Sequence, residues 1–142
     1  MSAYVDSSFL VPSYITDAHS KHVDTCMASC PSMWYTEFNR AELANAIYQQ
    51  VFLKRLTPAD AAGVWSDFQR DCADGVWTRV EFPHRSWETC IDLARRHGHA
   101  LGVRTLDSLH VACALELKAQ KFWTFDDRQA RLAEAVGLDT SS

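Results

Sequence analysis

The 142-residue chain lacks several features that would assign it to a particular class of protein. No apolar run approaches the roughly 18 residues that a membrane-spanning helix requires, so we expect no membrane span. The first ten residues carry no Lys or Arg, whereas a secretory signal peptide begins with positive charge. The five cysteines include no C-x-x-C pair. This argues against a disulfide framework and favours a reducing cytoplasm.

The chain also lacks the excess of positive charge that nucleic-acid-binding proteins usually carry. Its 18 Asp and Glu outnumber its 14 Lys and Arg, which gives a formal net charge of −4. Four acidic residues account for the whole of this excess: Asp6, Glu42, Asp107 and Asp126. Divalent cations bound by these four would cancel it. The charge balance is therefore compatible with nucleic-acid binding but does not predict it.

What the chain does contain is typical of one soluble globular domain. A composition of 47% hydrophobic and 23% charged residues is ordinary for such domains. The length allows a substantial core without disulfides or a structural metal. There are no internal repeats, low-complexity segments or linkers. We therefore expect residues 1–142 to form a single domain.

Hydrophobic patterning predicts strands that alternate with helices. Short apolar runs predict strands at residues 3–5, 33–35, 76–80 and 122–125. Helical spacing predicts helices at residues 17–29, 37–54, 58–73, 84–97, 105–118 and 127–136. Gly98 and Gly137 are the expected helix stops. This alternation is typical of a three-layer α/β/α fold with a mainly parallel central sheet.

Three of the four acidic residues lie at or near predicted strand-to-helix junctions. Asp6 ends the first apolar run, Asp126 ends the last, and Asp107 opens a predicted helix. Ser7 and Ser8 are expected to cap the helix that follows the first strand. Open α/β sheets place their binding crevice outside the carboxyl ends of the strands. The pattern therefore predicts a polar site at that edge.

Each of these three acids also has a purely structural interpretation. Asp6 and Asp126 are possible helix N-caps, and Gln129 completes a capping-box pattern with Asp126. Asp107 in a first helical turn would stabilise the helix dipole. Glu42 is different, because it lies inside a largely apolar helix. An unpaired carboxylate there is costly unless a cation or a proton compensates it.

Taken together, these segments resemble the PIN-domain ribonucleases, and in particular the VapC-type toxins of toxin–antitoxin pairs. The C-terminal half carries the most specific part of the resemblance, with TLDSLHVA at 105–112, TFD at 124–126 and AVGL at 135–138. YVDSS at 4–8 resembles the opening strand and first acid of the family, and RAEL at 40–43 the segment with its second acid. The resemblance covers essentially the whole chain.

The resemblance implies a metal-dependent endoribonuclease that cleaves single-stranded or loop RNA. It implies one or two Mg²⁺ or Mn²⁺ ions surrounded by Asp6, Glu42, Asp107 and Asp126, and hard divalent cations do take oxygen ligands. Such an ion activates water and screens charge on the leaving oxygen. Ser8 and Thr124 match polar positions near such sites and are expected to hold water or a carboxylate. A cognate antitoxin covering the active-site groove and a homodimer are also implied.

RNA binding would require positive charge beside the acids. The densest basic segment leads into Asp107 and supplies Arg95, Arg96 and Arg104 as candidate phosphate contacts. An ordinary solvated helix end explains the same segment equally well. For the antitoxin, large apolar residues predict a groove between the helices at 37–54 and 58–73. These residues are Tyr48, Phe52, Trp65 and Phe68.

A haloacid-dehalogenase-type phosphatase would need a second Asp two residues after Asp6, where this chain has Ser8. A non-catalytic PIN-fold module that binds RNA or protein remains the open alternative.

Three further residue patterns have structural interpretations. His110, three residues after Asp107, is interpreted as a core histidine rather than a general base. Asp127 is interpreted as a first-turn acid. Zinc-type ligands also occur in one predicted helix, at His19, His22, Cys26 and Cys30. That string spans roughly 16 Å at the helical rise, too far for one tetrahedral ion. We therefore interpret it as part of an amphipathic helix.

Overall fold

A parallel sheet forms the centre of the computed structural model, which describes residues 1–29 and 32–142. The strands are β1 (Ser2–Val5), β2 (Ser32–Tyr35), β3 (Thr78–Arg79) and β4 (Lys121–Trp123), in the order β3-β2-β1-β4. The helices are α1 (Ser7–Leu10), the 3-10 helix η1 (Val11–Ser13), α2 (Ser20–Ser29), α3 (Glu37–Phe52), α4 (Pro58–Ala73), α5 (Ser86–Leu101), α6 (Thr105–Glu116) and α7 (Asp127–Ala135).

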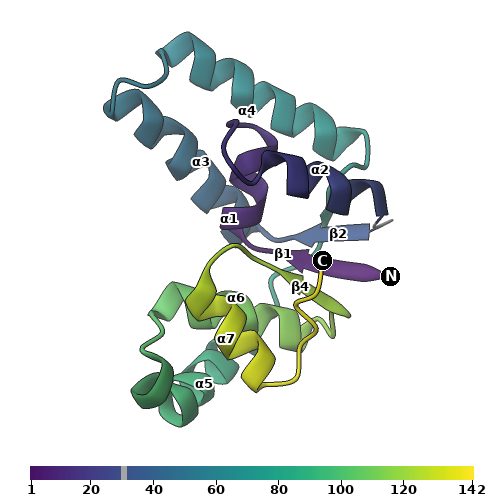
Figure 1. The fold of residues 1–142 in the computed structure, drawn as a ribbon, viewed down its shortest axis with the longest axis vertical. Helices are drawn as coiled ribbons and strands as arrows, with labels where there is room; N and C mark the ends of the chain where they lie inside the picture. Colours follow the sequence, from purple (N-terminus) through teal and green to yellow (C-terminus); the bar gives the residue numbers. More distant parts are fainter. Residues whose placement is uncertain (30–31) are drawn as a thin grey trace.

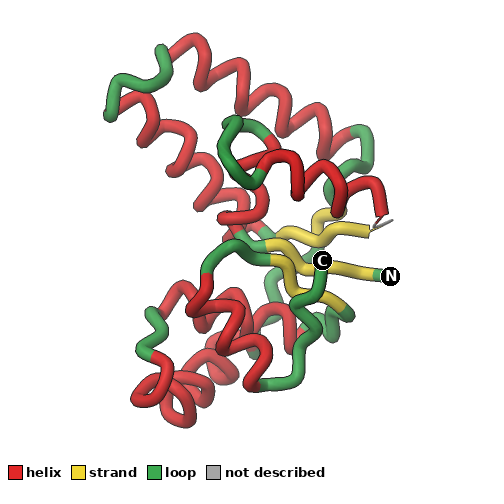
Figure 2. Tube along the Cα trace, viewed as in Figure 1, coloured by secondary structure: helices red, strands yellow, loops and turns green. Residues whose placement is uncertain are grey.

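Helices cover both faces of this sheet (Figures 1 and 2). The helices α1 to α4 lie on one side and α5 to α7 on the other. Ala3 and Val5 of β1 belong to the core of the first layer, and Tyr4 between them belongs to the core of the second. Burial on both faces explains why the strands read as continuous apolar runs. The predicted three-layer α/β/α fold with a parallel sheet is confirmed.

The carboxyl ends of three neighbouring strands place polar residues at one edge of the sheet. Asp6 follows β1, Thr36 follows β2 and begins α3 as its N-cap, and Thr124 follows β4. The Asn39 amide in the first turn of α3 donates to the backbone oxygen of Val5. This hydrogen bond fixes the start of α3 against the end of β1. Within residues 1–29 and 32–142, no helix is long and apolar enough to cross a membrane.

Several element boundaries differ from the prediction. The strand predicted at 76–80 is reduced to the two-residue edge strand β3, and β4 ends at Trp123 instead of residue 125. In place of continued strand pairing, the backbone nitrogen of Phe125 donates to the hydroxyl of Ser8. Local side-chain hydrogen bonds of this kind compete with strand pairing.

The predicted helix stop at Gly98 is wrong. Helix α5 continues through Gly98 to Leu101, and Gly102 ends it in the left-handed conformation, with φ of 62°. The backbone nitrogen of Gly102 donates to the oxygen of Gly98 at 2.9 Å. A glycine inside a helix is only mildly unfavourable, whereas a left-handed C-cap strongly favours glycine. Gly102 therefore determines where α5 ends.

The two glycines give a matched stability test. No atom lies within 4 Å of a Cβ built at either position, so steric clash does not enter. Gly98→Ala should raise the free energy of unfolding by about 0.5–1 kcal/mol, because alanine is the better helix former. Gly102→Ala should lower it by about 1–2 kcal/mol, the cost of a left-handed alanine. Chemical denaturation measures both, and changes of the same sign would contradict this assignment of the helix end.

Candidate active site

Asp6 is the most deeply buried of the four acids, with 1% of its surface exposed. It is the N-cap of α1 and accepts from the backbone nitrogen of Phe9 at 3.1 Å, so the role predicted for the following serines belongs to Asp6 itself. Ser8 donates to its Oδ1 and Thr124 to its Oδ2, both at 2.7 Å. Burial raises the pKa of this carboxyl, and the charge of His110 and the two hydroxyls oppose the rise only in part.

Thr124 connects Asp6 to Asp126. Its hydroxyl donates to Asp6 and accepts from the backbone nitrogen of Asp126 at 2.9 Å. Asp126 is the N-cap of α7 and accepts from the backbone nitrogen of Gln129 at 3.0 Å. The predicted N-cap role of Asp126 is therefore present alongside its position in the acidic cluster.

Asp107 is also buried, with 4% of its surface exposed, and it is held from two sides. Its Oδ2 accepts from the backbone nitrogen and the Nε atom of Arg104, each at 3.3 Å. Its Oδ1 accepts from Nε2 of Gln129 at 3.2 Å. The guanidinium of Arg104 is largely exposed to solvent. One oxygen of this carboxylate therefore faces a charged, solvent-exposed group and the other a buried neutral amide.

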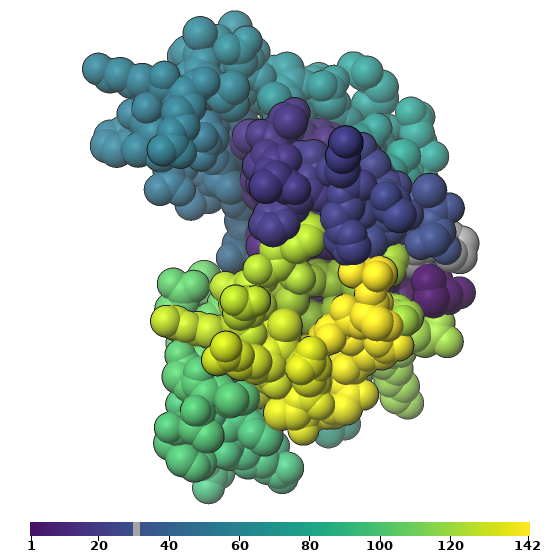
Figure 3. All heavy atoms as spheres, viewed as in Figure 1, coloured from purple at the N-terminus to yellow at the C-terminus, as the bar shows by residue number. Residues whose placement is uncertain are grey.

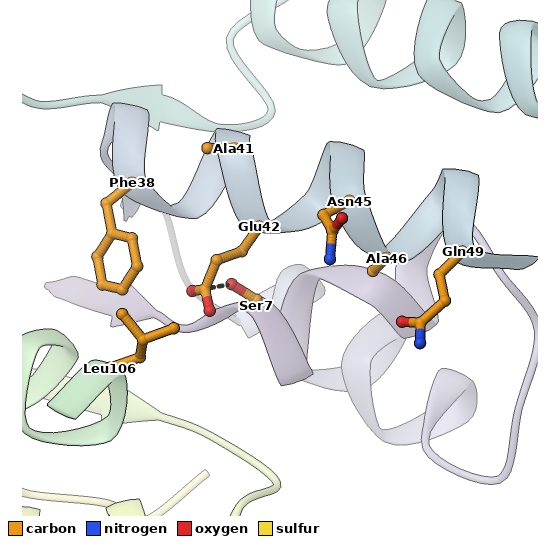
Figure 4. Close-up of a pocket in the computed structure, with 8 residues that line it drawn as sticks. All are labelled: Ser7, Phe38, Ala41, Glu42, Asn45, Ala46, Gln49 and Leu106. Atoms are coloured by element: carbon orange, nitrogen blue, oxygen red, sulfur yellow. Dashed lines mark hydrogen bonds between the residues drawn. The ribbon is translucent and has the colours of Figure 1, made fainter. Parts of the chain in front are cut away.

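Glu42 projects from α3 towards α1 (Figure 4). Its Oε1 accepts from the Ser7 hydroxyl at 2.7 Å and is also hydrogen bonded to Nε2 of His110. Burial acts to raise the pKa of Glu42, but the hydrogen bond and charge of His110, together with Ser7, bring it below its ordinary value. The carboxylate lines one hollow together with Arg104 and Asp107. The compensation that this partly buried carboxylate was expected to need comes, within the protein, from Ser7 and His110.

His110 is a core residue, as predicted, but it is also part of a polar chain. Its ring is buried and stacks on Phe38 with 4.2 Å between centroids. Its Nδ1 lies 2.8 Å from the hydroxyl of Tyr4, which donates to Oδ1 of Asn39 at 3.2 Å. The other ring nitrogen, Nε2, is hydrogen bonded to Glu42, so the imidazole connects Tyr4 in the core to the carboxylate of the site.

The contact between His110 and Glu42 was not predicted from the sequence. The one available signal is the spacing of His110 three residues after Asp107, which places both on one side of α6. That spacing does not identify Glu42 as the partner, because Glu42 is 68 residues away in the chain.

The three arginines predicted to contact phosphate do not all lie at the acidic site. Arg104 contacts Asp107, as described above. Arg96 forms an ion pair with Asp92 at 3.2 Å, one turn earlier in α5. Arg95 is exposed on the same helix. Among the described residues, Arg104 is the one of these three that contacts a carboxylate of the site.

A hollow does lie between α3 and α4, but of the four large apolar residues predicted to line it only Phe68 does so, beside polar residues such as Arg40 and Gln69. Phe68 is 1% exposed and belongs to the core, and Trp65 packs against it. Tyr48 and Phe52 of α3 are exposed, as expected. A second hollow lies along α3 where it faces α1 and α6, and its lining includes Ser7, Phe38, Ala41, Glu42, Asn45, Ala46, Gln49 and Leu106 (Figure 4). The space-filling view is notched between α3 and the segment containing α6 (Figure 3).

The zinc-type string does not form a ligand set. His22 and Cys26, one turn apart on α2, are joined at 3.5 Å. The ring of His19 instead stacks on Phe125 with 4.0 Å between centroids. Cys30 lies outside the described residues. His19 precedes α2, and within the helix His22 is exposed and Cys26 buried, in agreement with the interpretation as an amphipathic helix.

The acids form a connected set of oxygen donors. Thr124 links Asp6 to Asp126, Gln129 links Asp126 to Asp107, and Ser7, the neighbour of Asp6, donates to Glu42. Among the described residues, no three His, Cys, Asp or Glu side chains are already arranged to hold a metal ion. Oxygen donors of this kind nevertheless suit Mg²⁺ or Mn²⁺ rather than a thiophilic metal. Binding an ion would require Asp107 to exchange its contact with the exposed Arg104.

Comparison with known proteins identifies a family. The model of the PIN domain family matches residues 3–135. No curated protein matched the chain.

Solved structures share the fold. VapC20 from Mycobacterium tuberculosis, described as a sarcin–ricin loop cleaving toxin, is 17% identical with a TM-score of 0.70, over 96% of this chain and 95% of its own. FitAcB from Neisseria gonorrhoeae is 12% identical with a TM-score of 0.71, over 99% and 96%. VapBC2 from Rickettsia felis, bound to a promoter DNA fragment, is 12% identical with a TM-score of 0.69, over 99% and 98%. At these identities the likeness establishes the fold.

We expect the hydroxyl of Thr124 to contribute to the free energy of unfolding. Thr124→Val keeps the shape but removes the hydroxyl that binds both Asp6 and the backbone of Asp126. The free energy of unfolding should fall by about 1–3 kcal/mol, because a buried carboxylate loses a donor. Thr124→Ser keeps the hydroxyl and should lose less. Equal stability of the two variants in urea denaturation would show that the hydroxyl does not support the acids.

Proposed function

The chain belongs to the PIN-domain family, and we propose that it is a metal-dependent endoribonuclease and the toxin of a VapC-type toxin–antitoxin pair. The observation that carries this proposal is the connected set of acids at the carboxyl edge of the sheet. Residues from four separate segments of the chain converge there. Single-stranded or loop RNA is the proposed substrate. VapC20, described as a toxin that cleaves the sarcin–ricin loop, supports this substrate class.

The proposed ligands of the metal are Asp6, Asp107, Asp126 and Glu42. When bound, Mg²⁺ or Mn²⁺ supplies the positive charge that activates water and screens the leaving oxygen. Neighbouring side chains hold these carboxylates in position. Ser8 and Thr124 fix both oxygens of Asp6 by donating to them, which orients the carboxylate without neutralising it.

Arg104 is the proposed phosphate contact. Its guanidinium is exposed and lies against Asp107. A cation that takes over Asp107 would release this guanidinium, and arginine binds phosphate oxygens well. The scissile phosphate would then be held beside the acids by a residue that the structure already positions there. Arg95 and Arg96, farther along the same basic segment, are proposed only as contacts to more distant phosphates.

The most direct test of the activity is incubation of the purified, partner-free protein with total RNA. Fragments should appear with Mg²⁺ or Mn²⁺ and not with a chelator present. Asp126→Asn should abolish cleavage, because it removes a charge from the proposed site while an asparagine can still cap α7. Asp127→Asn changes the exposed neighbour and should cleave like the wild type. Equal activity of both variants would favour another site, and no cleavage by the wild type would favour the non-catalytic module.

We further propose that the antitoxin occupies the hollow along α3. This surface combines apolar side chains, including Phe38 and Leu106, with the Glu42 carboxylate near its middle. An apolar segment with a basic side chain complements it. VapBC2 and FitAcB, which share the fold, support a proposal of this kind.

A basic antitoxin side chain at Glu42 would compete with metal for the same carboxylates. A peptide carrying the antitoxin segment should therefore suppress cleavage, and raising Mg²⁺ should partly restore it. Replacing the basic residue of the peptide by an uncharged one should remove the dependence on Mg²⁺. Inhibition that is independent of Mg²⁺ with both peptides would reject charge replacement and leave steric cover as the mechanism.

We also propose that the chain forms a homodimer. Trp87 and Ile91 lie one turn apart on α5 and are each about half exposed, which is unusual for adjacent large apolar residues. Sedimentation equilibrium should give twice the mass of one chain. Ile91→Asp should reduce the mass to that of a monomer, whereas Leu53→Asp, on another exposed apolar residue, should not. A dimer that survives Ile91→Asp would place the interface elsewhere.

A further inference from the structure

Gln129 lies between two of the proposed metal ligands. It is the third residue of α7, and its backbone nitrogen donates to Oδ1 of Asp126 at 3.0 Å. Its side-chain Nε2 donates to Oδ1 of Asp107 at 3.2 Å. One residue therefore contacts both acids, which come from different helices.

The side chain of Gln129 is not needed to cap α7. In a capping box, the third helical residue reaches back to the backbone nitrogen of the N-cap. Here the backbone nitrogen of Asp126 already donates to the hydroxyl of Thr124 at 2.9 Å. The predicted capping box is therefore only half formed, and the amide of Gln129 points towards α6 instead.

The amide oxygen of Gln129 has no partner in the described part of the chain. The residue is 6% exposed, and its Oε1 makes no hydrogen bond to any described residue. Buried polar atoms are nearly always paired, and an unpaired one destabilises the fold. The unpaired oxygen therefore belongs to the same amide group whose nitrogen contacts the Asp107 carboxylate. A partner that is not part of the protein would account for it.

We propose that Gln129 belongs to the metal site: its Nε2 holds Asp107 in place, and its Oε1 is an oxygen donor to the cation that the acids bind. This proposal rests on the proposed function. Side-chain amide oxygens are accepted ligands of hard divalent cations. A neutral donor also adds no further repulsion to a site that already gathers four carboxylates. The amide therefore orients Asp107 and leaves its charge available, whereas Arg104 offsets that charge.

The test measures Mn²⁺ affinity of the folded protein by calorimetric titration. Gln129→Met keeps the length of the side chain and removes both polar atoms. It should fold, and its affinity for Mn²⁺ should fall about 10- to 100-fold, as is usual when a residue supporting a metal ligand is removed. The matched control is Gln69→Met at an exposed position on α4, which should bind Mn²⁺ like the wild type. Wild-type affinity in Gln129→Met would overturn the proposal.

If Gln129→Met does not fold, Gln129→Glu tests whether Gln129 belongs to the metal site. It places a second carboxylate beside Asp107 and should lower the melting temperature without metal. Since an oxygen is kept near the cation, Mn²⁺ should raise its melting temperature more than that of the wild type. A rise no larger than in the wild type would reject the proposal. A wild-type protein that binds no Mn²⁺ would reject the proposed function as well, whereas binding unaffected by both substitutions would reject only the role of Gln129.

Discussion

Negative charge gathers at the carboxyl edge of the sheet and has to be compensated. Many of the hydrogen bonds and ion pairs near this edge provide that compensation. Parallel pairing brings the ends of β1, β2 and β4 to one edge, where the following residues include Asp6 and Asp126. Carboxylates that are close and partly buried repel one another and lose hydration. The fold can keep them only if each has a partner. In the described structure, each of the four acids has at least one.

The partners are of two kinds, and the difference matters for function. Hydroxyl and backbone groups donate to Asp6 and Asp126 and leave their charge in place. Arg104 and His110, in contrast, are basic side chains, and they contact Asp107 and Glu42. A metal ion would have to displace Arg104 and His110 from these carboxylates, but it could leave the hydroxyl and backbone donors in place. Arg104 is exposed and easily displaced, whereas His110 is buried and packed on Phe38.

The sequence predicts the architecture well because it depends on local patterns. Alternating apolar runs and helical spacing predict the layers, and parallel strands require their carboxyl ends to share an edge. The positions of Asp6 and Asp126 follow from that rule alone. Helix ends were predicted less well, since both Gly98 and Gly102 are plausible stops in the sequence. The choice between them depends on which one adopts a positive φ.

The pairings inside the site depend on packing between distant segments and could not be predicted in this way. Glu42 meets His110 because α3 and α6 approach each other near the edge of the sheet. Gln129 points to Asp107 because Thr124 has already taken the backbone nitrogen of Asp126. Phe68 was expected to leave apolar surface for a partner, yet packing of α4 against the sheet buries it in the core. Some of these contacts join residues that are far apart in the chain. Others depend on which of two residues takes a shared hydrogen-bond partner.

The central claim is that the four acids and Gln129 bind one metal centre. A crystal structure of the partner-free protein with Mn²⁺, in which anomalous scattering locates the ion, tests this most directly. We expect an anomalous peak between Asp6, Asp107 and Asp126, with Arg104 turned away from Asp107. A peak at another place in the molecule, with the contact between Arg104 and Asp107 intact, would contradict it.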